Sequence, residues 1–274
     1  MRHWLLAGLS LCLLAGCATQ VAPVASSAAL PTPLAGEDIW QPAPGTSWQW
    51  QLSGTFDDSI EAQVYDLDLF DTPKSTVKEL HARGVKVICY ISVGSWEDWR
   101  PDAADFPQEV IGRRYSGWPG ERWLDVRRID VVAPIMEARL DLCAAKGFDG
   151  VEPDNLDGYD TATGFPLSGA DQLAYNAWLA NAAHQRGLAI GLKNDPVQAA
   201  DLLPYFDFAI TEDCFDQGWC GEMMPFIEQG KPVFAAEYTD TGVDLDEICA
   251  QAEALQFSLI LKQRSLDAGR EGCP

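Results

Sequence analysis

Amphipathic stretches alternate with apolar runs along most of the chain, and one kind of junction recurs between them. A stretch typical of a helix ends in a basic or polar residue, a glycine follows, and an apolar run begins at once. This junction occurs at Gly84, Gly147, Gly187 and Gly230. Glycine suits the left-handed conformation that ends a helix, and a cation near the helix end is favoured by the helix dipole. Four such junctions predict repeated βα units and a parallel sheet.

The apolar runs predict eight strands, the number that closes a single-domain (β/α)8 TIM barrel. No glycine-rich phosphate loop follows the first strand, which argues against the alternative of an open, doubly wound α/β sheet. Residues 123–126 form either a ninth short strand or part of the long excursion between residues 94 and 129. The eight expected strands are Trp48–Leu52, Ala62–Leu67, Val85–Ile91, Phe148–Glu152, Leu188–Lys193, Phe208–Thr211, Val233–Glu237 and Ser258–Lys262.

The first residues have the pattern of a processing signal. Arg2 supplies a positive charge, and the apolar core at residues 4–14 is too short for a permanent membrane span. The next residues, LAGC, resemble the bacterial lipoprotein box, in which cleavage precedes a cysteine that is then acylated. Cys17 is therefore the expected lipidation site, and an ordinary secretory peptide with an incidental cysteine is the alternative. Ala18 follows Cys17 where Asp would signal inner-membrane retention, which implies an outer-membrane lipoprotein, periplasmic or at the cell surface.

These features divide the chain into three segments. Residues 1–16 are the expected lipoprotein signal peptide. Residues 17–35 contain the lipidated cysteine and an uncharged stretch rich in Ala, Pro, Ser and Val, which predicts a flexible tether. Residues 36–274 have a suitable length for one (β/α)8 domain.

Cysteine usage predicts disulfides. Six cysteines remain after the signal peptide and lipidation, and an even number in an exported protein is typical of disulfide pairing. Six cysteines allow fifteen pairings. Proximity in the chain favours Cys214–Cys220 and Cys249–Cys273, which leaves Cys89–Cys143. No C-x-x-C pair occurs, and the histidines have no cysteine beside them, so we expect neither a metal nor a cofactor.

The formal net charge is −22 at pH 7. Such a charge disfavours nucleic acid as a partner, because neutralising phosphates needs a basic surface. It favours a cationic ligand, which an acidic cleft would attract, although solubility alone is the alternative explanation. We expect a monomer.

Charged side chains gather where the predicted strands end, which is the active face of a barrel. The densest cluster lies in FDGVEPDNLDGY, residues 148–159, where a strand leads into Glu152, Asp154 and Asp157. Adjacent carboxylates make chemical sense if one holds a proton at neutral pH while its neighbour stays ionised. A solvated turn is the alternative, because Asp and Asn are common turn residues.

A cleft rimmed by carboxylates and aromatic rings favours a carbohydrate ligand. Two carboxyl groups that flank a glycosidic bond can cleave it. Packing of long loops is the alternative explanation for the aromatic residues. Ser-His-Asp catalysis is disfavoured, because neither His81 nor His184 lies near a strand end. The aromatic residues on predicted loops of this face are Trp96, Trp99, Trp118, Trp123, Tyr159 and Trp219.

Five segments of the chain resemble glycoside hydrolase family 114, the endo-α-1,4-polygalactosaminidases and their relatives, which have a TIM-barrel domain. The resemblance extends from about residue 48 to residue 263. It implies hydrolysis of an α-1,4-linked galactosamine or N-acetylgalactosamine polysaccharide by paired carboxylates. Such amino-sugar polymers are cationic when deacetylated, in agreement with the acidic chain. The segments are YDLD at 65–68, VICYISVG at 87–94, DGVEPDN at 149–155, GLKN at 191–194 and TE at 211–212.

The resemblance also implies roles for individual residues. Asp154 is the expected nucleophile and Glu212 the expected general acid/base of a retaining enzyme, with inversion as the alternative. Lys193 is expected to keep one carboxylate ionised. A glycan-binding surface lipoprotein without catalytic activity and a hydrolase of another glycosidic linkage are the alternative functions. The expected sugar-binding residues are Asp66, Tyr90, Trp96, Asn155, Tyr159, Lys193 and Glu237.

Overall fold

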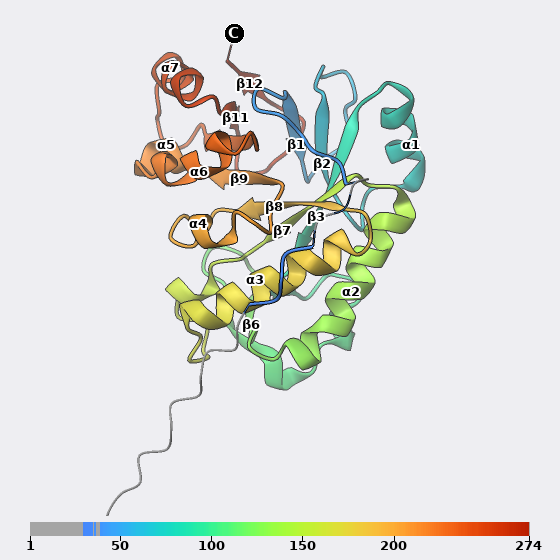
Figure 1. The fold of residues 1–274 in the computed structure, drawn as a ribbon. Helices are drawn as coiled ribbons and strands as arrows, with labels where there is room; N and C mark the ends of the chain where they lie inside the picture. Colours follow the sequence, from blue (N-terminus) through green and yellow to red (C-terminus); the bar gives the residue numbers. More distant parts are fainter. Residues whose placement is uncertain (1–29, 35, 37–38, 274) are drawn as a thin grey trace, which may run out of the picture.

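The computed structural model describes residues 30–34, 36 and 39–273. The predicted signal peptide, Cys17 and most of the predicted tether lie outside the described residues. In the part that is described, a curled parallel sheet is surrounded by helices (Figure 1). None of the helices in that part is long and apolar enough to cross a membrane.

Eight parallel strands follow one another around the sheet, and each predicted strand is present. This arrangement confirms the predicted (β/α)8 architecture. The second strand begins at Val64 and the fourth at Gly150, each two residues later than predicted. In order around the sheet, the strands are β1 (Trp48–Gln51), β2 (Val64–Asp68), β3 (Lys86–Ser92), β7 (Gly150–Asp154), β8 (Ala189–Lys193), β9 (Phe208–Glu212), β10 (Val233–Tyr238) and β11 (Ser258–Lys262).

Helices connect most of the strands and cover the outside of the barrel (Figure 1). The predicted junctions form as expected: α2 ends at Gly147, whose φ of 95° is left-handed and whose N–H donates to the carbonyls of Cys143 and Ala144. Ser168 and Asp171 form a capping box at the start of α3. The helices are α1 (Lys74–Ala82), α2 (Ile129–Lys146), α3 (Gly169–His184), α4 (Ala199–Leu202), α5 (Cys214–Gln217), α6 (Met224–Glu228) and α7 (Leu245–Leu255).

The chain after β11 fills the seam between the last and the first barrel strand. Its short strand β12 (Glu271–Gly272) pairs antiparallel with β11. The carbonyl of Leu266 accepts hydrogen bonds from the N–H groups of Leu52 and Ser53, at 2.9 and 3.1 Å. The indole of Trp48 in β1 donates to the carbonyl of Ser258 in β11 at 2.8 Å. These bonds join the two ends of the parallel sheet.

The long excursion between β3 and α2 folds into a small sheet of its own. Its antiparallel strands lie in the order β4-β6-β5, and they are β4 (Ser95–Glu97), β5 (Ile111–Arg114) and β6 (Glu121–Leu124). Residues 123–126 therefore belong in part to this sheet and do not add a ninth strand to the barrel. The small sheet stands at the C-terminal end of the barrel strands, because β4 follows β3 after only two residues.

The described residues contain three disulfides, Cys214–Cys220 and Cys249–Cys273, which chain proximity favoured, and Cys89–Cys143, the remaining pair. The Cys89–Cys143 disulfide ties β3 to α2. Residues 30–34, predicted as tether, lie against α3, where Asn181 bonds to both Thr32 and Leu34. The folded body therefore begins before residue 36, the predicted boundary.

Candidate active site

Side chains at alternate positions of the barrel strands point into the barrel. Near the start of the strands these positions are apolar and packed, as shown by Phe208 and Phe234, whose ring centroids lie 5.7 Å apart. Toward the C-terminal ends of the strands, the inward-pointing positions carry charged side chains. Glu152 and Asp154 stand two residues apart in β7, and Glu212 ends β9. The barrel therefore carries a layer of polar side chains on an apolar base.

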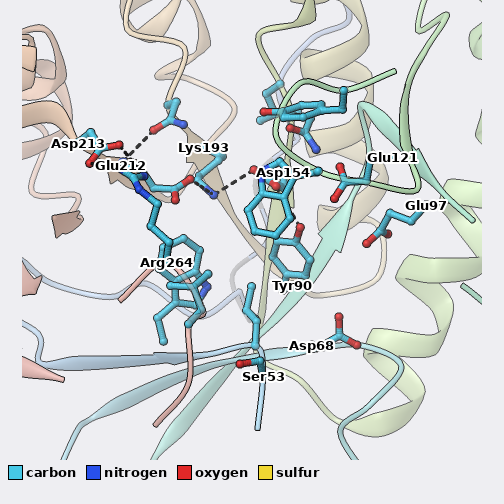
Figure 2. Close-up of a pocket in the computed structure, with 18 of the residues that line it drawn as sticks. Ser53, Asp68, Tyr90, Glu97, Glu121, Asp154, Lys193, Glu212, Asp213 and Arg264 are labelled. Carbon is cyan, nitrogen blue, oxygen red and sulfur yellow. Dashed lines mark hydrogen bonds and ion pairs between the residues drawn. The ribbon is translucent and has the colours of Figure 1, made fainter. Parts of the chain in front are cut away.

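Lys193, at the end of β8, lies at the centre of this polar layer (Figure 2). Its Nζ is 2.8 Å from Oε1 of Glu152, 3.0 Å from Oδ1 of Asp154 and 3.0 Å from Oε2 of Glu212. Burial by itself lowers the pKa of a lysine, but the three carboxylates outweigh burial and raise the pKa of Lys193 well above its ordinary value. Lys193 is therefore a permanent cation that holds Asp154 and Glu212 at one place.

Asp154 and Glu212 are close together and open to solvent. Both bond to the same nitrogen at 3.0 Å, so the two bonded oxygens are at most twice that distance, about 6 Å, apart. Tyr90 donates its hydroxyl to Oδ2 of Asp154 at 3.0 Å, and Tyr238 donates to Oε1 of Glu212. Burial and then the nearby carboxylates raise the pKa of both phenols, which therefore stay protonated and act as donors. The side chains of Asp154 and Glu212 are 22% and 26% exposed.

A second pair of carboxyl groups, Asp66 and Glu152, lies beneath Lys193, and neither is exposed. Burial, followed by the charge of Glu152, raises the pKa of Asp66 well above its ordinary value. Two adjacent buried carboxyl groups cannot both be ionised at low cost, so they retain a proton. Glu152 accepts a hydrogen bond from Lys193, and we therefore assign the proton to Asp66. The pairing of a protonated and an ionised carboxyl group was predicted from the sequence cluster around Asp154, but it occurs one layer deeper.

The polar layer opens into a cavity of about 660 Å³. Three cations line it, and each already has a carboxylate partner: Lys193 as described, Arg100 with Asp68 and Glu97, and Arg264 with Asp213. The cavity therefore has a large excess of acidic groups. In the part of the chain that the structure describes, no three His, Cys, Asp or Glu side chains are arranged as a metal site. The eight carboxylates that line the cavity are Asp68, Asp71, Glu97, Glu121, Asp154, Asp157, Glu212 and Asp213.

The backbone next to Asp154 is held in an unusual conformation. Asn155 has a φ of 67°, in the left-handed region, and its side chain donates to Ser92 Oγ at 3.0 Å. The N–H groups of Val93 and Gly94 donate to the carbonyl of Asp154 at 3.0 and 3.2 Å. A Cβ on Gly94 would meet the carbonyl oxygen of Asn155 at 1.8 Å. The turn after β3 therefore fits against the turn after β7 only because residue 94 has no side chain.

The structure brings five of the predicted site residues together around the cavity: Tyr90, Asp154, Asn155, Lys193 and Glu212. Two others, predicted to bind sugar, are buried away from it. Asp66 is wholly enclosed beneath Lys193, and Glu237 is wholly buried, where it accepts the N–H groups of residues 215 and 216 at the start of α5. The prediction that these two carboxyl groups line sugar subsites is wrong, because both are used inside the fold.

Trp96 and Tyr159 were also predicted to bind sugar. Neither side chain lines the cavity. The indole of Trp96 donates to the carbonyl of Ala103 at 2.9 Å and packs against the core. The hydroxyl of Tyr159 donates to Asp195 at 2.9 Å. Both aromatic residues are therefore tied to loops of the active face by hydrogen bonds, and their role in sugar binding stays a prediction.

Four of the cavity residues that the sequence did not indicate come from the excursion between β3 and α2. A single signal was available in the sequence, the concentration of aromatic and charged residues there, and it does not show which of them face inward. Trp50 of β1 was missed because a tryptophan in a predicted strand is normally core; its ring lies 4.7 Å from Lys193 Nζ. Three aromatics predicted on this face, Trp99, Trp118 and Trp219, do line the cavity. The missed residues include Trp50, Glu97, Arg100, Tyr115 and Glu121.

Comparison with known proteins agrees with this geometry. The sequence profile of glycoside-hydrolase family GH114 matches residues 29–274. The chain belongs to family GH114. Its structure is similar to that of Ega3 from Aspergillus fumigatus, which was solved in complex with galactosamine: the two are 38% identical, with a TM-score of 0.83, over 89% of this chain and 100% of Ega3.

Two further relatives are more distant. The glycoside hydrolase domain of PelA from Pseudomonas aeruginosa shares the fold, with a TM-score of 0.64 over 84% of this chain and 98% of that domain, at 14% identity. An uncharacterised protein of Deinococcus radiodurans is 27% identical over 94% of this chain and 96% of its own length. Both matches cover most of this chain.

Proposed function

We propose that this GH114 protein hydrolyses an α-1,4-linked galactosamine polysaccharide at the carboxylate pair Asp154 and Glu212. The observation that carries the proposal is the shared contact of these two side chains with Lys193, which sets both at one cavity. The two oxygens that bond to Lys193 are at most about 6 Å apart, which supports a retaining mechanism, since retaining pairs lie about 5–5.5 Å apart and inverting pairs about 6.5–9.5 Å. The excess of cavity carboxylates supports a cationic amino sugar as the ligand.

The proposed chemistry has two steps. In the first, an Asp154 oxygen bonds to the anomeric carbon, the bond from that carbon to the leaving oxygen breaks, and Glu212 gives its proton to the leaving oxygen. In the second, Glu212 takes a proton from water, the water oxygen bonds to the anomeric carbon, and the bond to Asp154 breaks. Tyr90 and Lys193 fix the orientation of Asp154 throughout, and Tyr238 does the same for Glu212.

Removal of either carboxylate tests the proposal. Asp154→Asn and Glu212→Gln keep the shape of each side chain. We expect each substitution to lower the rate of cleavage of a galactosamine oligomer about 100- to 10,000-fold. New reducing ends report the cleavage, and circular dichroism reports the fold. Full turnover by both folded variants would exclude this pair. Binding without new reducing ends by the wild type would favour a glycan-binding protein, and cleavage of a different polymer would favour another linkage.

Azide distinguishes the two roles. With Glu212→Ala, azide should attack the covalent intermediate and give the α-glycosyl azide, with retained configuration. With Asp154→Ala, azide should replace the missing nucleophile and give the β-glycosyl azide. The anomer of each product, read by NMR, assigns the roles, and the opposite pair of products would exchange them.

We also propose that the protein is exported and anchored by a lipid on Cys17, with the barrel at the outer membrane. The proposal is supported by the LAGC sequence and by the uncharged stretch that follows it. Mass spectrometry of the mature N-terminal peptide should find acylated Cys17. A Cys17→Ser variant should leave the membrane fraction, and retention of that variant in the membrane would argue for a different anchor.

A further inference from the structure

Glu121 of β6 is an unusual member of the cavity wall. Three of the eight cavity carboxylates, Asp71, Glu121 and Asp157, form no ion pair in the part of the chain that the structure describes. Asp71 is exposed at the rim and Asp157 is half-buried, whereas Glu121 is only 8% exposed. Placing an ionised carboxylate in such a site without a cation is unfavourable. The part of the cavity that Glu121 lines therefore suits a cationic group of the ligand.

Hydrogen bonds fix the Glu121 carboxylate and leave part of it free. Ser95 donates its hydroxyl to Oε2 of Glu121 at 2.9 Å. The hydroxyl of Ser95 also lies 2.7 Å from that of Ser92, to which Asn155 donates at 3.0 Å. Both serines are buried. Oε1 of Glu121 has no such partner, so one oxygen is held and the other is available to a ligand.

The hydrogen-bond chain also places Glu121 relative to the reacting bond. It runs from Glu121 through two serines to Asn155, the neighbour of Asp154. In Figure 2 the Glu121 carboxylate is turned toward Asp154, on the side opposite Glu212. Burial, with contributions from Glu97 and Asp154, raises the pKa of Glu121 to about 7, and an ammonium ligand would restore its charge. Because the hydrogen-bond chain and this orientation place Glu121 close to Asp154, a substituent of a sugar unit held at Asp154 can reach the Glu121 carboxylate.

We propose that Glu121 binds the ammonium group of a galactosamine unit beside Asp154 and so makes the site select deacetylated over N-acetylated sugar. The inference rests on the proposed function for the identity of the sugar. An ammonium group can donate charge-assisted hydrogen bonds to Oε1, whereas an N-acetyl group is neutral and bulkier and leaves the buried carboxylate without a cation. Arg100 cannot supply that cation, because it already pairs with Asp68 and Glu97 at 2.7 and 2.8 Å.

Glu121→Gln is the appropriate variant, because the amide oxygen still accepts the Ser95 hydroxyl while the charge is lost. Glu109→Gln is the matched control: the same change in the same excursion, on an exposed residue outside the cavity. Calorimetry should measure the binding of a galactosamine trimer and of an N-acetylgalactosamine trimer to the wild type and to both variants. We expect Glu121→Gln to weaken binding of the galactosamine trimer about 10- to 100-fold, with the acetylated trimer little changed and Glu109→Gln like the wild type.

An equal loss for both trimers, or no loss for either, would overturn the role of Glu121. The binding measurement does not require turnover, so it is independent of hydrolysis. A wild type that binds the galactosamine trimer through Glu121 but releases no reducing ends would contradict the proposed hydrolase and leave the ammonium site supported.

Discussion

At the scale of single residues, the least expected group is Asp66. Family resemblance placed it among the sugar-binding residues, yet it is wholly buried against Glu152, under the cation that joins the catalytic pair. A protonated Asp66 can donate to Glu152, whose Oε1 accepts a hydrogen bond from Lys193. Ionisation of Asp66 would add another negative charge to a buried site that already holds Glu152 and, next to it, Asp154. The role of Asp66 is therefore to keep Glu152 ionised and in place. Glu152 in turn holds the position of Lys193.

This assignment predicts how stability depends on pH. A raised pKa in the folded state means that folding takes up a proton at pH values between the ordinary aspartate pKa of about 4 and the raised native pKa. The wild type should therefore lose stability as pH rises from about 4, by up to about 1.4 kcal/mol per pH unit, until the native pKa is passed. Asp66→Asn mimics the protonated acid, so this part of the slope should disappear. Urea unfolding at a series of pH values measures it.

Asp66→Ala is the control, because it removes both the charge and the donor to Glu152. We expect it to be less stable than Asp66→Asn at every pH, since alanine has no group that can donate to the buried Oε2 of Glu152, which has no other partner among the described residues. Identical pH slopes for the wild type and Asp66→Asn would show that Asp66 does not hold the proton.

At the scale of elements, the turns after β3 and β7 form one unit. The backbone of Val93 and Gly94 bonds to the carbonyl of Asp154, and the Asn155 side chain bonds back to Ser92. The two strands are also in register, with Ser92 opposite Asp154. The position of Asp154 at the cavity therefore depends on the close approach of these two turns.

The substitution Gly94→Ala should separate the turn after β3 from the turn after β7. The added Cβ would overlap the carbonyl oxygen of Asn155, so one turn must move by about an ångström or more, and misplacement of this size can cost about 100-fold in rate. Turnover of a galactosamine oligomer measures the loss. Gly221→Ala serves as the control, because a Cβ there meets no atom within 4 Å. A Gly94→Ala variant with wild-type turnover would show that the turns can shift without moving Asp154.

The barrel strands could be predicted from the sequence, whereas the small sheet between β3 and α2 could not. The barrel strands were readable because helix-ending glycines and apolar runs repeat, and Asp154 and Glu212 because each stands at a strand end. The excursion carries no such repeat, and its short strands β4 and β6 are defined by pairing with each other, which local pattern does not encode. Glu97 and Glu121 were therefore missed. The opposite error, for Asp66 and Glu237, arose because the resemblance places a residue on a strand but does not give its depth in the barrel.

At the scale of the whole molecule, two electrostatic features act in the same direction. The chain has a formal net charge of −22, and its cavity has eight carboxylates against three cations. The attraction due to the net charge reaches about one Debye length from the surface, which is about 10 Å at 0.1 M salt. The attraction due to the cavity carboxylates acts inside a partly enclosed site, where salt screens it less. A cationic polymer should therefore be attracted to the molecule and then concentrated at the cavity.

This reasoning predicts a salt dependence that grows with substrate charge. For galactosamine oligomers of one length, raising the salt concentration should increase KM, by about tenfold for the fully deacetylated oligomer between low and high salt, because screening removes long-range attraction. It should leave kcat nearly unchanged, since the Lys193 side chain that contacts Asp154 and Glu212 is only 2% exposed and these short contacts are screened only weakly by salt. Steady-state kinetics across a series of graded N-acetylation tests both points, because each acetyl group removes one cation and should flatten the plot of log KM against log salt. Equal slopes along the series would mean that the acidic surface does not contribute to substrate capture, and a fall in kcat would place the salt effect at the catalytic pair itself.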